Sequence, residues 1–300
     1  MSATAELGST PEPSRVWNWK RINLANSIGL FLIHGAALGV LFVGVSWPAA
    51  IAAWCAYWIQ IFGVSAGYHR YFAHRTFRTS RAFQFVLAYM GAMAAQMGPL
   101  WWASYHRRHH AHSDEPADIH SPRQGGFWWA HIGWVLFENG NQMDANYVKD
   151  WNRYAELRWL DDYRWVPPAS LLVSMFGLGL WLQATHPEWG AGPWQMAVWG
   201  FAVSTAFMHH VTFSVNSVTH MFGRRRFATK DDSRNVWWLA LLTNGEGWHN
   251  NHHRFPMSEK HGLRWWELDV THWMLRGLQQ FGVVWGIRTQ PVGIVRAAKR

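Results

Sequence analysis

The sequence NSIGLFLIHGAALGVLFVGV occupies residues 26–45, and AAIAAWCAYWIQIFGVSAGY follows at residues 49–68. Neither run contains Asp, Glu, Lys or Arg, and each has the length of about 20 residues that a helix needs to cross the hydrocarbon layer. A second pair of apolar runs lies at residues 166–183 and 194–215, joined by ATHPEWGAGP. The sequence therefore predicts an all-α integral membrane protein with four transmembrane helices.

Basic residues are distributed unevenly around these runs. Of the 27 Lys and Arg residues, three precede the first run, 11 lie between the second and third, and 13 follow the fourth. The two short connecting loops contain none, and cytoplasmic loops are the ones enriched in Lys and Arg. We therefore expect both termini and the segments 69–165 and 216–300 to be cytoplasmic, in the inner membrane if the protein is bacterial.

The net charge and the cysteine content limit which partners and metal sites this protein can have. The net charge is +9 at pH 7, which suits either nucleic acid or an anionic lipid leaflet. Because no nucleic-acid-binding module occurs and the charge follows the expected topology, we expect phospholipid and no nucleic acid. The single cysteine, Cys55, excludes a disulfide or a thiolate metal site within the chain. We expect a flexible segment at residues 1–20 and one membrane domain over residues 21–300.

Nine histidines stand in four motifs: HRYFAH at residues 69–74, HRRHH at 106–110, NSVTH at 216–220 and HNNHH at 249–253. Histidine is the commonest metal ligand. In an α-helix, residues i and i+4 lie about 40° apart around the axis, whereas i+3 points elsewhere. If HRRHH is helical, His106 and His110 share one ion and His109 faces another; in HNNHH, His249 and His253 are likewise separated from His252. Nine imidazoles also exceed the three or four ligands of one zinc, so the motifs predict a dinuclear metal site in a cytoplasmic helical cap.

Carboxylates lie close to these motifs in the sequence. Asp114, Asp118 and Glu246 are each within a few residues of a predicted ligand. Carboxylates often accept the second imidazole N–H of a metal-bound histidine and fix the ring. We expect these three to support the ligands, although solvated surface charges would need no such role. His112 and His120 also lie near the second motif, more plausibly as supporting residues than as ligands.

The order of the motifs resembles that of the membrane-bound fatty-acyl desaturases of the stearoyl-CoA desaturase type. The likeness runs from about residue 26 to residue 256, and GFWWAHIGW (126–134) and GEGWHNNHHRFP (245–256) strengthen it. The resemblance implies four transmembrane helices under a cap that holds two iron ions, and no fused cytochrome b5. It assigns one iron to His69, His74, His106, His110 and His252, and the other to His109, His220, His249 and His253, with Asn216 reaching it through water.

The same resemblance implies an oxidoreductase that uses O₂ and two electrons to introduce a cis double bond, at the Δ9 position, into a saturated acyl chain. No cysteine set or nucleotide-binding fingerprint is present, so the electrons must come from an external donor such as a ferredoxin or a cytochrome and flavoprotein system. Arg224, Arg225 and Arg226 are candidates for docking an acidic carrier and, equally, for binding phospholipid headgroups.

The acyl carrier stays open, because the sequence departs from the family at positions that hold CoA. Animal members have an Arg-Lys pair after the GW motif and an Arg-Asp pair before the second histidine motif. Here these positions are Glu138 and Asn139, and Ser104 and Tyr105. Lipid-linked or ACP-linked chains are therefore alternatives to acyl-CoA. Other candidate substrate positions are Asn26, which matches a family position near the carrier, and Phe213, where animal members have Trp. Tyr57 and Ile61, 12 and eight residues before His69 in the second run, are candidates for setting the tunnel depth, with ordinary helix packing as the alternative role of each.

Two other functions remain possible from the residues alone. A membrane hydroxylase acting on alkanes, sterols or fatty acyl chains would share three histidine motifs. A protein with structural or hydrolytic zinc would use the same ligand type without redox chemistry. The NSVTH motif and the short HRYFAH spacing favour desaturation over hydroxylation.

Overall fold

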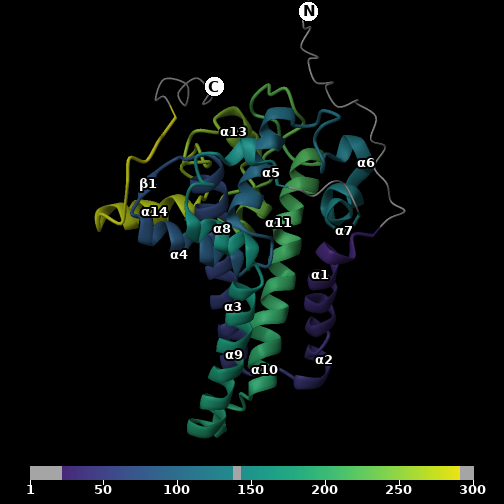
Figure 1. Cartoon of the computed structure of the whole chain (residues 1–300), viewed down its shortest axis with the longest axis vertical. Coiled ribbons are helices and arrows are strands. Elements are labelled where there is room, and N and C mark those ends of the chain that lie inside the picture. The colour runs from purple at the N-terminus through teal and green to yellow at the C-terminus, as the bar shows by residue number, and fades with distance from the viewer. Residues whose placement is uncertain (1–21, 138–142, 291–300) are drawn as a thin grey trace, which may run out of the picture.

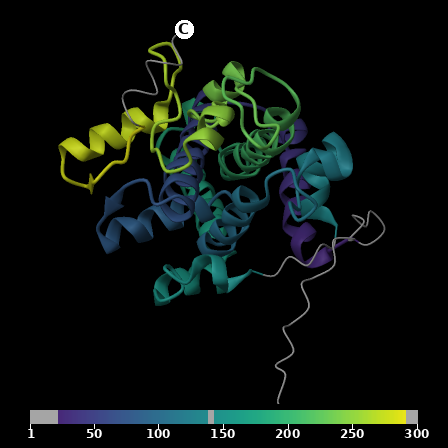
Figure 2. The same ribbon diagram turned by 90° about the horizontal axis from the view of Figure 1, so that it is seen from above.

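The computed structural model describes residues 22–137 and 143–290, and the expected flexible segment 1–20 and the carrier positions Glu138 and Asn139 lie outside this range. The described chain is mostly helical and forms an elongated bundle that carries a wider cap at one end (Figure 1). Viewed along the bundle, the cap extends to both sides, with α14 (Val270–Gln280) at one edge and α6 (Pro122–Trp128) at the other (Figure 2).

The first two expected spans form a helical hairpin. The first consists of α1 (Leu24–Ala37) and the short α2 (Val40–Val43). The second begins with α3 (Trp47–Phe62), where the Ser46 side chain accepts a hydrogen bond from the Ala49 N–H and Pro48 occupies the first turn. These are favourable residues for a helix start. The helix continues without a break into a π-helix, η1 (Gly63–Ala73).

The second pair of expected spans has the same form. The helix α9 (Val166–Thr185) is followed by a turn containing η4 (Pro187–Trp189). The chain then returns through α10 (Pro193–Ala197), the π-helix η5 (Val198–Val203) and α11 (Ser204–Met221), which form one continuous helix. Two helices of the described chain, Trp47–Ala73 and Val166–Thr185, are long and apolar enough to cross a membrane, and a shorter apolar helix covers Ser27–Val43.

Helices of the cap pack around the upper ends of these spans. Glycine allows a close contact here: a Cβ on Gly63 would lie 2.3 Å from the backbone of Met90 and Gly91, so η1 and α4 (Arg81–Ala92) are in direct contact. Leu87, Ala88 and Ala92 of α4 are buried in the main apolar core. The cap comprises α4 (Arg81–Ala92), α5 (Pro99–His112), α6, the π-helix η2 (Trp129–Gly133), α7 (Trp134–Leu136), η3 (Ala145–Val148), α8 (Ala155–Asp162), α12 (Trp237–Leu242), α13 (His249–Arg254) and α14.

A two-stranded antiparallel sheet joins distant parts of the cap. Strand β1 (Arg78–Thr79) pairs with β2 (Val284–Trp285), with Arg78 opposite Trp285 and Thr79 opposite Val284. The sheet ties the segment after the first histidine motif to the segment after α14. Because Val284 belongs to the same buried core as α4 and η1, the C-terminal part of the described chain helps to hold the histidine-bearing helices in place.

Candidate metal centre

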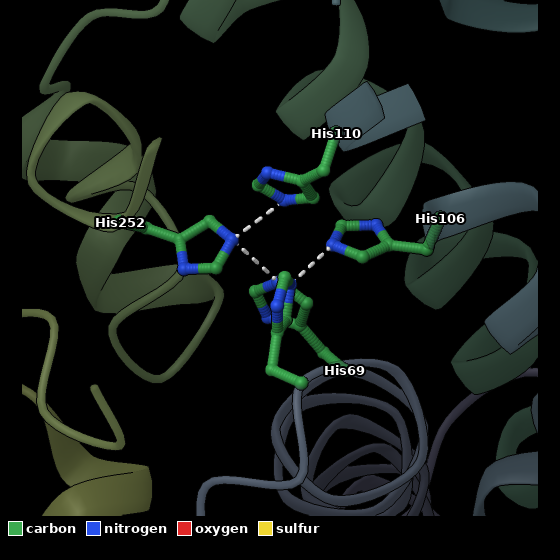
Figure 3. A group of neighbouring side chains, drawn as sticks. His69, His106, His110 and His252 are labelled. Atoms are coloured by element: carbon green, nitrogen blue, oxygen red, sulfur yellow. Dashed lines mark hydrogen bonds between the residues drawn. The ribbon is translucent and has the colours of Figure 1, made fainter. Parts of the chain in front are cut away.

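Five histidines from three parts of the chain meet where the cap helices α5 and α13 pack against η1. Their possible ligand nitrogens all lie within 4.8 Å of one another. The Nε2 atoms of His69 and His252 are 3.0 Å apart, those of His252 and His110 are 2.9 Å apart, and those of His74 and His106 are 2.8 Å apart. Figure 3 shows the rings of His106, His110 and His252 pointing toward a common centre above His69. We refer to this group as the five-histidine cluster: His69, His74, His106, His110 and His252.

The π-helix explains how His69 and His74 share this cluster. Five residues apart, two side chains would point in different directions on an α-helix, since each residue turns the chain by about 100°. A π-helix has i to i+5 hydrogen bonds and therefore a wider turn, and the N–H of His74 donates to the carbonyl of His69 at 3.1 Å. The two rings thus lie on one face, 4.9 Å apart between centroids.

The remaining four histidines form a second group, the four-histidine cluster, whose ligand nitrogens also lie within 4.8 Å of one another. The Nε2 atom of His249 is 3.1 Å from that of His220 and 3.0 Å from that of His253. His109 and His110 are neighbours in α5, yet they belong to different clusters because successive residues point to different sides of a helix. The members of the four-histidine cluster are His109, His220, His249 and His253.

Carboxylates hold the far nitrogens of these rings. Asp118 lies 2.9 Å from the Nδ1 atom of His109, and Asp114 lies 2.9 Å from that of His220. Glu246 lies 2.5 Å from Nδ1 of His69 in the other cluster. Each of the three carboxylates that the sequence singled out is therefore beside a histidine of a cluster.

The hydrogen bonding at Nδ1 determines what the clusters can bind. When Nδ1–H donates to a carboxylate, a neutral imidazole presents a lone pair at Nε2. The Nε2 atoms of His220 and His253 both approach Nε2 of His249, which can offer at most one proton to the two. A cation among the converging lone pairs satisfies this arrangement, so both clusters fit a metal ion.

Burial keeps most of these rings neutral. It lowers the pKa of His106, His110, His249 and His252 well below the usual value, and neighbouring histidines lower it further. At Asp118 burial alone would raise the pKa, but His109 and His120 lower it below its ordinary range. His109 differs, because burial lowers its pKa but Asp118 outweighs burial and raises it. The site thus combines several neutral rings with an ionised carboxylate beside His109.

Three supporting residues were not predicted from the sequence. Asp231 lies 2.8 Å from Nδ1 of His253. Arg70 is fully buried and donates to Glu246, as well as to Glu259 and Asp269. His261 is 3.2 Å from Glu246. The only sequence signal for Arg70 was its position next to His69, and Asp231 and His261 gave none.

The two further histidines near the second motif have different positions. His120 is buried, with its Nδ1 atom 3.2 Å from Asp118, and burial lowers its pKa to about 3. It belongs to neither cluster, although its ring lies 4.5 Å from that of His109. His112 is partly exposed and contacts Glu115 at 3.2 Å.

Two cavities reach the clusters. The outer cavity, of about 820 Å³, lies between α1, α5, α9 and α11 and reaches His106 and Asn216. The inner cavity, of about 50 Å³, is bordered by Ile61, His69 and His249. Trp102, His106, Thr212 and Asn216 border both, so the two cavities meet beside the histidine clusters.

Comparison with known proteins decides the family. The sequence profile described as fatty acid desaturase matches residues 44–288. This chain belongs to the fatty acid desaturase family. It is a fatty acyl desaturase, an oxidoreductase that acts on acyl chains, and its helical membrane fold and histidine clusters suit the metal centre of that family.

Curated relatives agree over most of their length. The chain is 36% identical over 271 residues to an sn-1 stearoyl-lipid 9-desaturase from Anabaena variabilis, covering 89% of this chain and 94% of the relative. It is 37% identical to an sn-1 stearoyl-lipid 9-desaturase from Synechocystis sp., covering 96% and 86%. An icosanoyl-CoA 5-desaturase from Limnanthes douglasii is 34% identical, covering 90% and 73%. The relatives therefore differ in the carrier that their names record.

The residues that we expected to contact the acyl chain differ in their position relative to the two cavities. Ile61 borders the inner cavity, and Phe213 borders the outer one. Tyr57 borders neither; its hydroxyl donates to the carbonyl of Leu242. Asn26 lies in α1, but its side chain is outside the described part of the structure.

Several side chains that we expected to recognise an acyl carrier or an electron donor instead contact other residues of this protein. The Ser104 hydroxyl donates to the carbonyl of Asp144 at 3.0 Å, while Tyr105 borders the outer cavity and stacks on Trp101. In the arginine triplet, Arg226 pairs with Glu267. Arg225 donates to the carbonyl of Thr229 at 2.9 Å, and Arg224 is exposed.

Proposed function

We propose that this desaturase is an integral-membrane diiron enzyme that introduces a cis double bond at the Δ9 position of a saturated acyl chain. The separation of nine histidines into two adjacent clusters carries the proposal, since each cluster offers enough imidazole ligands for one ion. Imidazole ligands suit iron but also zinc, copper and nickel. Iron is the choice that fits the redox chemistry of a desaturase, because zinc has no redox role.

Each histidine cluster would hold one of the two irons. The five-histidine cluster would hold one iron and the four-histidine cluster the other, with Asn216 near the second ion through a water molecule. Two irons bound there would supply the activation of O₂. The reaction removes two hydrogens from adjacent methylenes, and these two hydrogens, together with O₂, two electrons and two protons, form two molecules of water.

The protein must also position the acyl chain. A methylene chain has no polar group near the reacting carbons, so selectivity comes from holding the chain in one orientation. The chain would run from the outer cavity past Trp102 and Thr212 into the inner cavity, which ends at Ile61 and Val64. Asp118, Asp114, Asp231 and Glu246 would keep the ligand rings oriented through their Nδ1 atoms.

The proposed topology has four transmembrane helices, 26–45, 49–68, 166–183 and 194–215, within a single membrane domain over residues 21–300. Exposed apolar side chains along these helices support contact with lipid: Phe42 is 87% exposed, Leu41 76% and Val173 69%. The distribution of Lys and Arg supports a cytoplasmic cap and cytoplasmic termini.

Electrons would come from an external protein, such as a ferredoxin or a cytochrome and flavoprotein pair. Arg224 and Arg225 support this choice, because they lie in the same loop that brings Asp231 to His253. A docked acidic carrier would then be close to the four-histidine cluster. Phospholipid headgroups remain the competing partner for these arginines.

Expression in a host that lacks desaturases tests the function. Gas chromatography with mass spectrometry should show monounsaturated chains with the double bond at carbon 9, and the His109→Ala variant serves as the inactive control. Purified protein should contain two irons and consume O₂ when reduced. A hydroxylated product without alkene would contradict desaturation, and two zinc ions with no O₂ consumption would contradict the diiron proposal.

A further inference from the structure

The outer cavity extends well beyond the histidine clusters, along the membrane-spanning helices. Its lining continues down α1 to Ala36 and includes Leu172 of α9 and Phe201 of η5. Ala36 lies near the end of α1 farthest from Asn23, whose N–H bonds to the carbonyl of Leu136 in the cap. The cavity is therefore a long groove that begins at the metal centre and descends between the spans.

The groove is open on the side that faces lipid. Leu32 of α1 is 66% exposed and Leu172 of α9 is 38% exposed, although both line the groove. Residues that are both exposed and lining mark its rim. In Figure 1, α1 and α9 stand on opposite sides of α11, which forms the floor through Phe213 and Asn216.

The lining carries almost no charge to hold a polyanionic carrier. Among the residues that the structure describes, the lining contains one acidic carboxylate, Asp162, and one arginine, Arg164, whose charges offset each other. CoA bears several phosphate charges and would need several cations, since buried or bound phosphate is held by Arg and Lys. Trp165, at the same end of the groove, is 62% exposed, and indole rings favour the headgroup level of a bilayer.

We propose that the groove admits one acyl chain of a membrane glycerolipid sideways from the bilayer, between α1 and α9. This inference rests on the proposed desaturase function and names its substrate class. The glycerol and headgroup remain near Arg164 and Trp165, and the second acyl chain stays in the membrane. Lateral entry avoids moving the chain through water, which would cost about 0.8 kcal/mol for each methylene exposed.

Two substrates distinguish this proposal from its alternatives. The holoenzyme is reconstituted with reduced ferredoxin, either in vesicles of 1-stearoyl-2-oleoyl-phosphatidylcholine or in dioleoyl-phosphatidylcholine vesicles supplied with stearoyl-CoA. We expect alkene in the stearoyl chain of the lipid, at a rate at least roughly ten times that on stearoyl-CoA. Equal or faster conversion of stearoyl-CoA would overturn the inference while leaving the desaturase function intact. Conversion of neither would remove the proposed function and the inference with it.

A binding measurement tests the route without requiring turnover. Phosphatidylcholine with a diazirine in the middle of its sn-1 chain is photolysed in vesicles containing the protein, and adducts are mapped by mass spectrometry. We expect adducts on residues 212–216 of α11, beside the clusters. Ala169→Trp, which fills the groove, should remove these adducts, whereas Val173→Trp, on the same helix but outside the groove, should retain them. Persistence of the adducts in Ala169→Trp would overturn the lateral route.

Discussion

Asp231 Oδ2 lies 2.8 Å from Nδ1 of His253, although 22 residues separate the two in the sequence. Burial alone would raise the pKa of Asp231, but His253 lowers it below the ordinary range, so the carboxylate is ionised. With Asp114 and Asp118, it gives the four-histidine cluster three carboxylate contacts, whereas Glu246 is the single carboxylate that contacts the five-histidine cluster in the described part of the chain.

Replacing Asp231 by Asn should weaken metal binding at the four-histidine cluster. The amide oxygen can still accept from Nδ1, but the negative charge that increases the basicity of the ring is lost. Supporting residues of this kind change metal affinity by roughly 10- to 100-fold. Metal titration of the apoprotein measures the effect. Asp232→Asn is the matched control, because Asp232 pairs with Arg123 at the surface; an equal loss in both variants would contradict the prediction.

Removal of one histidine should affect one ion more than the other. His109→Ala and His220→Ala are expected to lower the metal content from two ions toward one and to abolish the alkene product. His74→Ala should do the same through the five-histidine cluster. His112→Ala, whose side chain contacts Glu115 near the surface, should keep both metal and activity. Metal analysis and product analysis together check the assignment, and an active His109 or His220 variant would refute it.

Enlarging the inner cavity should change the preferred acyl length. Ile61 borders this cavity, so Ile61→Ala provides room for a longer chain. One methylene in an apolar pocket changes selectivity by roughly 10- to 200-fold, and the ratio of long to short products should rise accordingly. Gas chromatography of the products measures the ratio. Ile59→Ala is the control, since Ile59 is 38% exposed on the same helix and borders neither cavity; unchanged lengths in Ile61→Ala would exclude Ile61 from the tunnel.

Asp161 should make stability depend on pH. Its carboxylate accepts the N–H groups of Leu100 and Trp101 at the start of α5, but burial outweighs these bonds and raises its pKa from 3.8 to about 6. As the pH rises, the unfolded chain therefore releases this proton first, and about 3 kcal/mol of stability should be lost between pH 4 and 6. Thermal unfolding of wild type and Asp161→Asn across this range should show a smaller decline in the variant; parallel profiles would contradict it.

Arg70 should be essential for stability. It is buried with Glu246, Glu259 and Asp269, and removing one partner from such a group leaves uncompensated charge. We expect Arg70→Met to destabilise the protein by about 3–5 kcal/mol. Arg75→Met, at a side chain 57% exposed, should change stability little. Comparison of unfolding temperatures in the same detergent checks the difference, and similar values for both variants would show that the buried charges are not coupled.

The sequence by itself determined the helical membrane class and the grouping of histidines within HRRHH and HNNHH. Long apolar runs need a hydrocarbon environment, and the i to i+4 spacing of His106 and His110 follows from the period of a helix. These properties depend on residues close together in the chain. They can therefore be read without knowing how distant segments pack.

Only the tertiary structure decided which motifs meet and what supports them. Chain folding brings Asp231 to His253 and Arg70 to Asp269. The groove between α1 and α9 likewise depends on how separate helices pack. Contacts across tens or hundreds of residues leave no local pattern, because they arise from the burial of surfaces that become neighbours only when the chain folds.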